Sequence, residues 1–89
     1  MNDLLDVGAV WRLSARVNAA QAAQFLGMQP EDIPILVRAK LLRPLGTPPP
    51  NGSKYFAARR LMELANDEKW LARASDAIVR HHHDRNHGE

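Results

Sequence analysis

The chain has 89 residues, no cysteine and a formal net charge of +2, and 45% of its residues are hydrophobic. This length predicts one domain with a modest core, and the lack of cysteine excludes a disulfide framework and a cysteine-based zinc site. No apolar stretch approaches the roughly 20 residues of a membrane-spanning helix, and the first ten residues carry two acids and no base, unlike a secretory signal. We therefore expect a small soluble protein of the reducing cytoplasm.

The charge distribution is more informative than the net charge. Residues 33–62 contain six basic residues and no acidic one, and acids flank this block on both sides. The six are Arg38, Lys40, Arg43, Lys54, Arg59 and Arg60. Such a one-signed block is either an ordinary solvated face or a surface for a polyanion such as nucleic acid.

The N-terminal segment has few constraints. Residues 1–10 are expected to form either a short helix or a frayed end. Apolar side chains at Val10, Trp11 and Leu13 are expected to pack on the core.

The first clear element is an alanine-rich helix. Asn18 is a good N-cap, residues 19–26 are nearly all strong helix formers, and Gly27 supplies a C-terminal stop. The small alanines on one face allow a neighbouring helix to approach closely.

A second helix is predicted from Ile33, with Asp32 as its cap and Pro34 in its first turn, where a missing N–H costs little. A start at Pro30 would instead cost one backbone hydrogen bond. We expect Pro44 to end the helix, together with Gly46. The buried stripe is predicted to comprise Ile33, Leu36, Val37, Leu41 and Leu42.

A stiff loop follows, because residues 47–53 contain three consecutive prolines and then Asn51-Gly52, a strong turn signal. The segments on either side, 42–45 and 54–56, are predicted to pair as a short β-hairpin. Such a hairpin would form a wing.

Two more helices complete the predicted fold. Residues 57–65 carry an apolar side that includes Leu61 and Leu64, and either Asn66 or Asp67 caps the last helix. On that helix Trp70, Leu71, Ala74 and Ile78 recur at steps of three and four residues, with His82 as a further candidate. The polar, histidine-rich tail 81–89 is expected to fray.

These pieces, in this order, resemble the MerR-like winged helix-turn-helix group, in particular the short excisionase-type DNA-binding domains. The resemblance lies in residues 18–28 (NAAQAAQFLGM), in the helix exit 40–44 (KLLRP) and in residues 52–56 (GSKYF). It implies a mainly α fold with a short β-hairpin wing and a C-terminal helix. We expect an N-terminal extension over 1–12, the winged domain over 13–72, and a helix extension with a polar tail over 73–89.

The resemblance also implies a function in DNA binding, as a small transcriptional regulator or an excisionase-like architectural factor. It makes residues 33–40 the recognition helix in the major groove and places phosphate contacts on the wing and the next helix. The candidate DNA-binding residues are Arg38, Lys40, Arg43, Lys54, Tyr55, Arg59 and Arg60. For the basic side chains the alternative explanation is ordinary solvent exposure, and for Tyr55 it is a ring packed over the core with its hydroxyl in water.

The opening of the predicted recognition helix departs from the family pattern, which usually has Ser, Thr or Arg there. Glu31 and Asp32 stand at this position between two prolines. Their carboxylates either repel phosphate, accept hydrogen bonds from cytosine amino groups, or only cap the helix. The departure supports an alternative function, a protein–protein interaction module that keeps the winged fold without base readout.

No catalytic pattern is present: the sequence lacks a glycine-rich phosphate loop, a Ser-His-Asp or Cys-His arrangement and a carboxylate pair among apolar residues. We expect no enzyme activity, small-molecule substrate or cofactor. His83 and His87 stand at i, i+4 near Asp84, but without another fixed ligand we expect no metal site. The stripe around Trp70 and Ile78 is expected either to close the core or to form a homodimer seam through the C-terminal helix.

Overall fold

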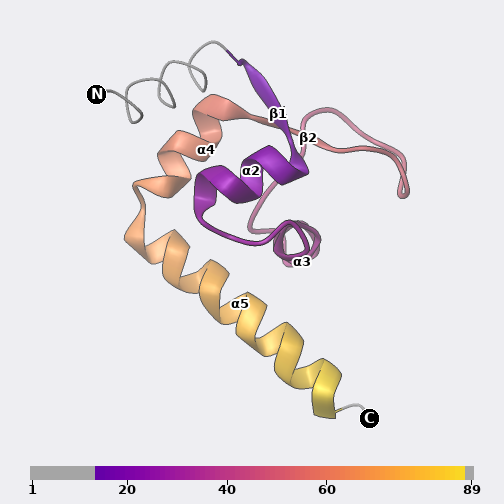
Figure 1. Cartoon of the computed structure of the whole chain (residues 1–89), viewed down its shortest axis with the longest axis vertical. Helices are drawn as coiled ribbons and strands as arrows, with labels where there is room; N and C mark the ends of the chain where they lie inside the picture. The colour runs from indigo at the N-terminus through magenta and orange to yellow at the C-terminus, as the bar shows by residue number, and fades with distance from the viewer. Residues whose placement is uncertain (1–13, 88–89) are drawn as a thin grey trace.

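The computed structural model describes residues 14–87, which form four helices and two short strands. In chain order the elements are β1 (Arg16–Asn18), α2 (Ala19–Leu26), α3 (Asp32–Arg38), β2 (Tyr55–Ala57), α4 (Ala58–Ala65) and α5 (Glu68–His87) (Figure 1). The described chain is thus mainly helical, as the sequence predicts. The expectations for residues 1–10 and for Val10, Trp11 and Leu13 lie outside the described residues.

Helix α2 begins and ends where the sequence predicts. The Asn18 side chain accepts the backbone N–H of Gln21 at 2.8 Å, and the Gln21 side chain accepts the N–H of Asn18 at 2.9 Å. This reciprocal capping box satisfies two N–H groups that the first helical turn leaves without partners. Gly27 ends the helix in the left-handed conformation at φ 73°, which glycine adopts without steric cost.

The predicted strand pairing is wrong. Residues 55–57 pair with β1, antiparallel, with Val17 opposite Phe56, and the segment 42–45 forms no strand. A hydrogen bond joins that segment to β2: the Leu45 N–H donates to the Tyr55 carbonyl at 2.8 Å. Pro44 has no N–H to donate to a ladder, whereas Val17 has a side chain that buries fully beside Phe56.

Helix α3 is shorter than predicted, because it ends at Arg38, before Pro44 is reached. Lys40 takes a left-handed conformation at φ 64°. The Lys40 N–H then bonds the Val37 carbonyl at 3.0 Å, and the Leu41 N–H bonds the Leu36 carbonyl at 2.9 Å. This is the Schellman pattern of a helix end, and it returns the chain to the core, where Leu42 is buried.

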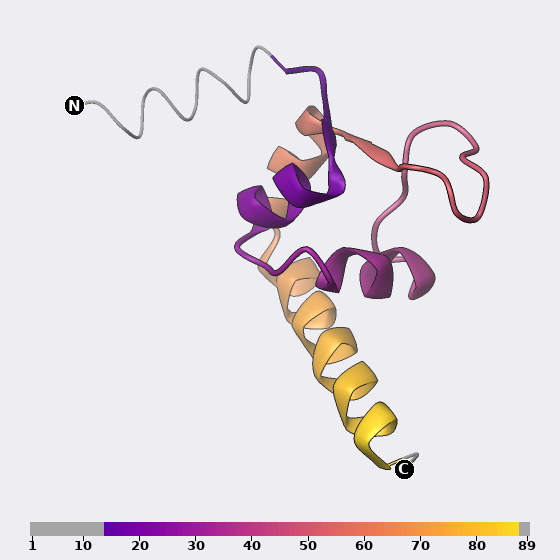
Figure 2. The same ribbon diagram turned by 45° about the vertical axis from the view of Figure 1, so that its right-hand side comes forward.

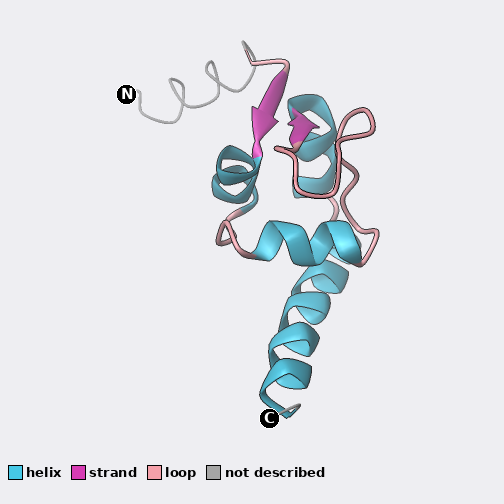
Figure 3. Ribbon diagram, turned by 90° about the vertical axis from the view of Figure 1, so that its right-hand side faces the viewer, coloured by secondary structure: helices cyan, strands magenta, loops and turns pink. Residues whose placement is uncertain are grey.

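The core lies where the four helices and the strand pair meet. Helix α2 packs on α4, and α3 lies across α5 (Figure 3). The largest fully buried side chains are Val17, Ile33, Leu36, Phe56 and Leu61. Ala22 and Ala23 have no exposed surface, so the close approach expected of the small alanines is confirmed.

Helix α5 begins as predicted but continues further. The Asp67 side chain accepts the N–H of Trp70 at 3.1 Å, which selects Asp67 as the cap. The expectation that residues 81–89 fray is wrong for residues 81–87, because α5 continues to His87. No glycine or proline interrupts residues 68–87, and His81 is half-buried. Within residues 14–87, no helix has the length and hydropathy that crossing a membrane requires.

We expect Trp70→Phe to lower the free energy of unfolding. The indole Nε1–H of Trp70 donates to the Leu41 carbonyl at 2.8 Å, and phenylalanine would leave that part-buried oxygen without its partner. The cost should be about 1–3 kcal/mol, measured by urea denaturation followed by far-UV circular dichroism. Tyr55→Phe is the control, because the Tyr55 ring is exposed and its change should stay within about 0.5 kcal/mol. Equal midpoints for the two variants would contradict the assignment.

Candidate nucleic-acid interface

The six basic residues of the block are divided among α3, the loop that follows it and α4. We call residues 39–54 the wing loop; it projects beyond α3 before the chain returns to β2 (Figure 2). Its tip contains the predicted turn, in which the Gly52 N–H bonds the Pro49 carbonyl at 2.9 Å. A Cβ on Gly52 would lie 2.6 Å from the Pro49 ring, so the turn requires glycine there.

Two of the candidate residues line one groove between α3 and the wing loop. This α3 groove has a volume of about 400 Å³, and Arg38 and Lys54 stand among its lining residues. Ile33, Val37 and Phe56 supply apolar lining. The Lys54 ammonium also donates to the Pro50 carbonyl at 3.3 Å, which holds the charged group against the wing loop. Two cations 16 positions apart in the sequence therefore share one surface.

A second pair lies on the α4 side of β2. Arg43 and Arg60 line a hollow of about 350 Å³ together with Leu45 and Phe56. Arg60 is held there by an ion pair with Glu63, at 3.0 Å between Nη1 and Oε1. Both side chains of this pair are more than half exposed, so the pair contributes little to stability but halves the local positive charge.

Tyr55 stands on the outer face of the strand pair. The Arg16 guanidinium lies 4.1 Å from the centre of the Tyr55 ring, a cation–π contact. Arg16 was not among the sequence candidates, because only the pairing of β1 with β2 brings it to Tyr55. The remaining candidates, Lys40 and Arg59, are exposed and line neither the α3 groove nor the hollow that Arg43 and Arg60 share.

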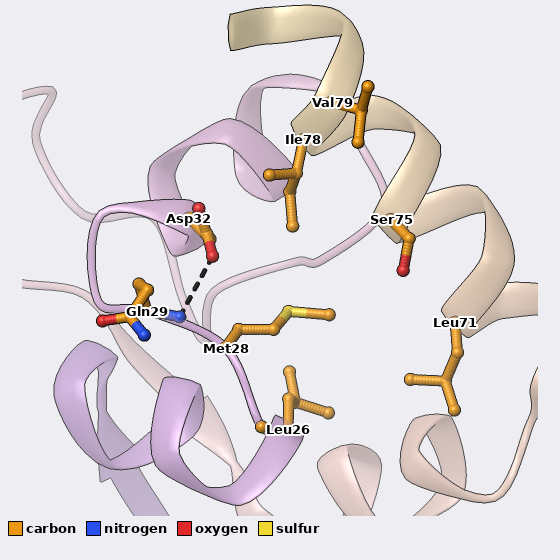
Figure 4. Close-up of a pocket in the computed structure, with 9 residues that line it drawn as sticks. Leu26, Met28, Gln29, Asp32, Leu71, Ser75, Ile78 and Val79 are labelled. Atoms are coloured by element: carbon orange, nitrogen blue, oxygen red, sulfur yellow. Dashed lines mark hydrogen bonds between the residues drawn. The ribbon is translucent and has the colours of Figure 1, made fainter.

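The two carboxylates at the start of α3 differ in their environment. Asp32 is 9% exposed, and its Oδ2 accepts the Gln29 N–H at 3.0 Å (Figure 4). Its Oδ1 lies 4.0 Å from Nε2 of His82 on α5. Glu31 is exposed and makes no capping hydrogen bond. The expectation that Asp32 caps α3 is therefore wrong: it closes the preceding turn, and Glu31 is the carboxylate that faces solvent.

The described residues offer no assembled metal site. No group of three or more His, Cys, Asp or Glu side chains in residues 14–87 is placed to hold a metal ion. Comparison with protein-family models, curated proteins and solved structures gives no match to this chain.

The environments of Asp32 and Glu31 predict different effects of substitution. Asp32→Ala removes the acceptor of a part-buried N–H and should lower the free energy of unfolding by about 1–3 kcal/mol. Glu31→Ala, the matched control on the neighbouring position, should change it by less than about 0.5 kcal/mol. Urea denaturation of both variants measures the difference. Equal losses would show that both acids cap the helix, which is one of the alternatives that the sequence leaves open.

Proposed function

We propose that the chain is a non-enzymatic DNA-binding module of winged helix-turn-helix type, acting in the cytoplasm as a small transcriptional regulator or an excisionase-like architectural factor. In this proposal α2 and α3 are the helix-turn-helix, and the wing loop is the wing. The observation that carries it is the α3 groove, where Arg38 of the helix and Lys54 of the wing line one surface. A duplex backbone laid against this groove meets both cations.

The exposed surface of α3 favours phosphate contacts over base readout. Within the helix, Pro34 and Arg38 are the exposed residues, and Pro34 has no side-chain donor or acceptor. Arg38 alone on α3 combines exposure with the donors that suit phosphate or a guanine edge. We infer that binding is mainly electrostatic and tolerant of sequence, as expected for an architectural role.

The alternative function is a protein–protein interaction module that has lost base readout. The acidic start of α3 is its main support, and this support is reduced because Asp32 is turned toward Gln29 and His82. The absence of duplex binding at low salt would make this alternative the better proposal.

We expect the protein to bind a random pool of duplex DNA with a steep dependence on salt. Each phosphate contact releases counterions, so about five contacts give a slope of about −4 to −5 when log affinity is plotted against log salt concentration. Fluorescence anisotropy of a labelled duplex over a salt series measures this slope. No binding at about 50 mM salt would overturn the proposal.

The double variant Arg38→Gln, Lys54→Gln tests the α3 groove directly. Loss of two phosphate contacts should make the salt slope shallower by about 1.8 and weaken binding roughly 60-fold at about 0.1 M salt, equally for all sequences. Lys69→Gln with Arg85→Gln is the control, because it removes the same charge from α5 at positions that line neither the α3 groove nor the hollow shared by Arg43 and Arg60. A double variant that alters sequence preference without loss of affinity would show base reading by these residues.

We also propose that two copies pair through α5, the homodimer that the sequence analysis left open. Val79 is 66% exposed on this helix. It borders a mainly apolar groove, which is lined by Leu26, Met28, Leu71 and Ile78 and has Gln29, Asp32 and Ser75 as polar members (Figure 4). The C-terminal end of α5 projects beyond the other elements (Figure 1), and a two-fold partner is a direct way to cover the exposed apolar face beside it. A dimer would double the phosphate contacts and raise the affinity for DNA.

Val79→Asp should convert a dimer of the wild-type protein into a monomer, because it places a charge at the centre of the proposed seam. Val79 is a better probe than Ile78, which is half-buried and packs on the core. Light scattering gives the mass in solution, and Leu45→Asp, at an exposed leucine on the wing loop, is the matched control. A monomeric wild-type protein would end this proposal, and a dimer that survives Val79→Asp would place the interface elsewhere.

A further inference from the structure

A third hollow lies at the C-terminal end of α3, where this helix crosses α5. It has a volume of about 210 Å³, and its lining includes Arg38 and Ala39 from the α3 side and Arg80, His81 and Asp84 from α5. Figure 3 shows the crossing that produces it, with α3 lying over the upper part of α5. We call this the α5 hollow.

The spacing on α5 explains why these residues share one side. Ala77, Arg80, His81 and Asp84 recur at steps of three or four residues, so they lie on one face of the helix. Ala77 has a small side chain and allows the end of α3 to approach α5. Arg38 and Arg80 are far apart in the sequence and line the same hollow because α3 and α5 pack together.

The arginines of the α5 hollow are free of ion pairs. Within residues 14–87, neither Arg38 nor Arg80 pairs with a carboxylate, although Asp84 lines the same hollow. Both side chains are exposed. An unpaired guanidinium presents a planar set of donors that matches two oxygens of one phosphate.

Arg38 joins the α5 hollow to the α3 groove, since it lines both. Lys54, Arg38 and Arg80 therefore form a continuous series of cations that runs from the base of the wing loop, across α3, to α5. The opposite side of α5, which carries Leu71, Ile78 and Val79, faces the apolar groove instead. A DNA contact through Arg80 and a partner on Val79 would thus use different faces of the helix.

We propose that Arg80 is a phosphate-binding residue, and that the α5 hollow extends the DNA surface from α3 onto the C-terminal helix. This inference rests on the proposed function. Asp84 sets a limit on the strength of the contact, because its carboxylate repels the same phosphate at short range. The partner is a backbone phosphate of duplex DNA, separate from the one that Arg38 contacts.

Arg80→Gln tests the inference in the full chain. Loss of one phosphate contact should make the salt slope shallower by about 0.9 and weaken duplex binding about 8-fold at 0.1 M salt. Asp84→Asn should act in the opposite direction and raise the affinity. Arg85→Gln is the control, because it removes the same charge from the same helix. Arg85 lies about 140° around the helix axis from Arg80 and does not line the hollow, so this variant should keep the wild-type salt slope.

The outcomes separate this inference from the proposed function. If the wild-type protein binds duplex DNA and Arg80→Gln has the same slope and affinity as Arg85→Gln, the inference fails and the proposed function stands. If the wild-type protein does not bind duplex DNA, both fail. A selective loss in Arg80→Gln supports the inference, with far-UV circular dichroism showing that the helix content of each variant is unchanged.

Discussion

The antiparallel pairing of Arg16–Asn18 with Tyr55–Ala57 holds together two segments that are far apart in the sequence. Helix α2 follows the first strand directly and α4 follows the second, so the pairing sets where both helices begin. The N–H of Ala58 extends the pairing by bonding the Ala15 carbonyl at 3.0 Å. Because Lys54 immediately precedes β2, the same pairing also anchors the end of the wing loop beside α3. The α3 groove depends on this anchor.

Helix α5 supports α3 at both ends of the crossing. Near its own start, Trp70 is buried and donates to the Leu41 carbonyl, just beyond the end of α3. Farther along, His82 approaches Asp32 at the start of α3. The proposed recognition helix has seven residues, too few to be stable alone. Its orientation therefore depends on α5, and this dependence also brings Arg80 to the same surface as Arg38.

The fold groups the charged residues of this small domain in a way that their order in the sequence does not predict. Of the basic residues between positions 33 and 62, Arg38 and Lys54 share the α3 groove, while Arg43 and Arg60 lie on the other side of Phe56. Glu63 partly neutralises Arg60, and Asp32 is withdrawn from solvent. The resulting positive series crosses α3 toward α5, although the sequence of α5 is mixed in charge.

The sequence by itself determined the features that depend on neighbouring residues. Asn18 caps α2, Gly27 ends it, the last helix begins after Asn66 or Asp67, and the proline-rich loop turns at Asn51-Gly52, because caps and turns are local hydrogen bonds and local backbone preferences. Only the tertiary structure decided that Val17 pairs with Phe56 and that α3 ends at Arg38. It also decided that His82 and Arg80 remain helical beside α3. These outcomes depend on which apolar surfaces from distant parts of the chain bury one another. The hydrophobic periodicity of a single segment shows which face is apolar, but it does not show which other segment covers that face.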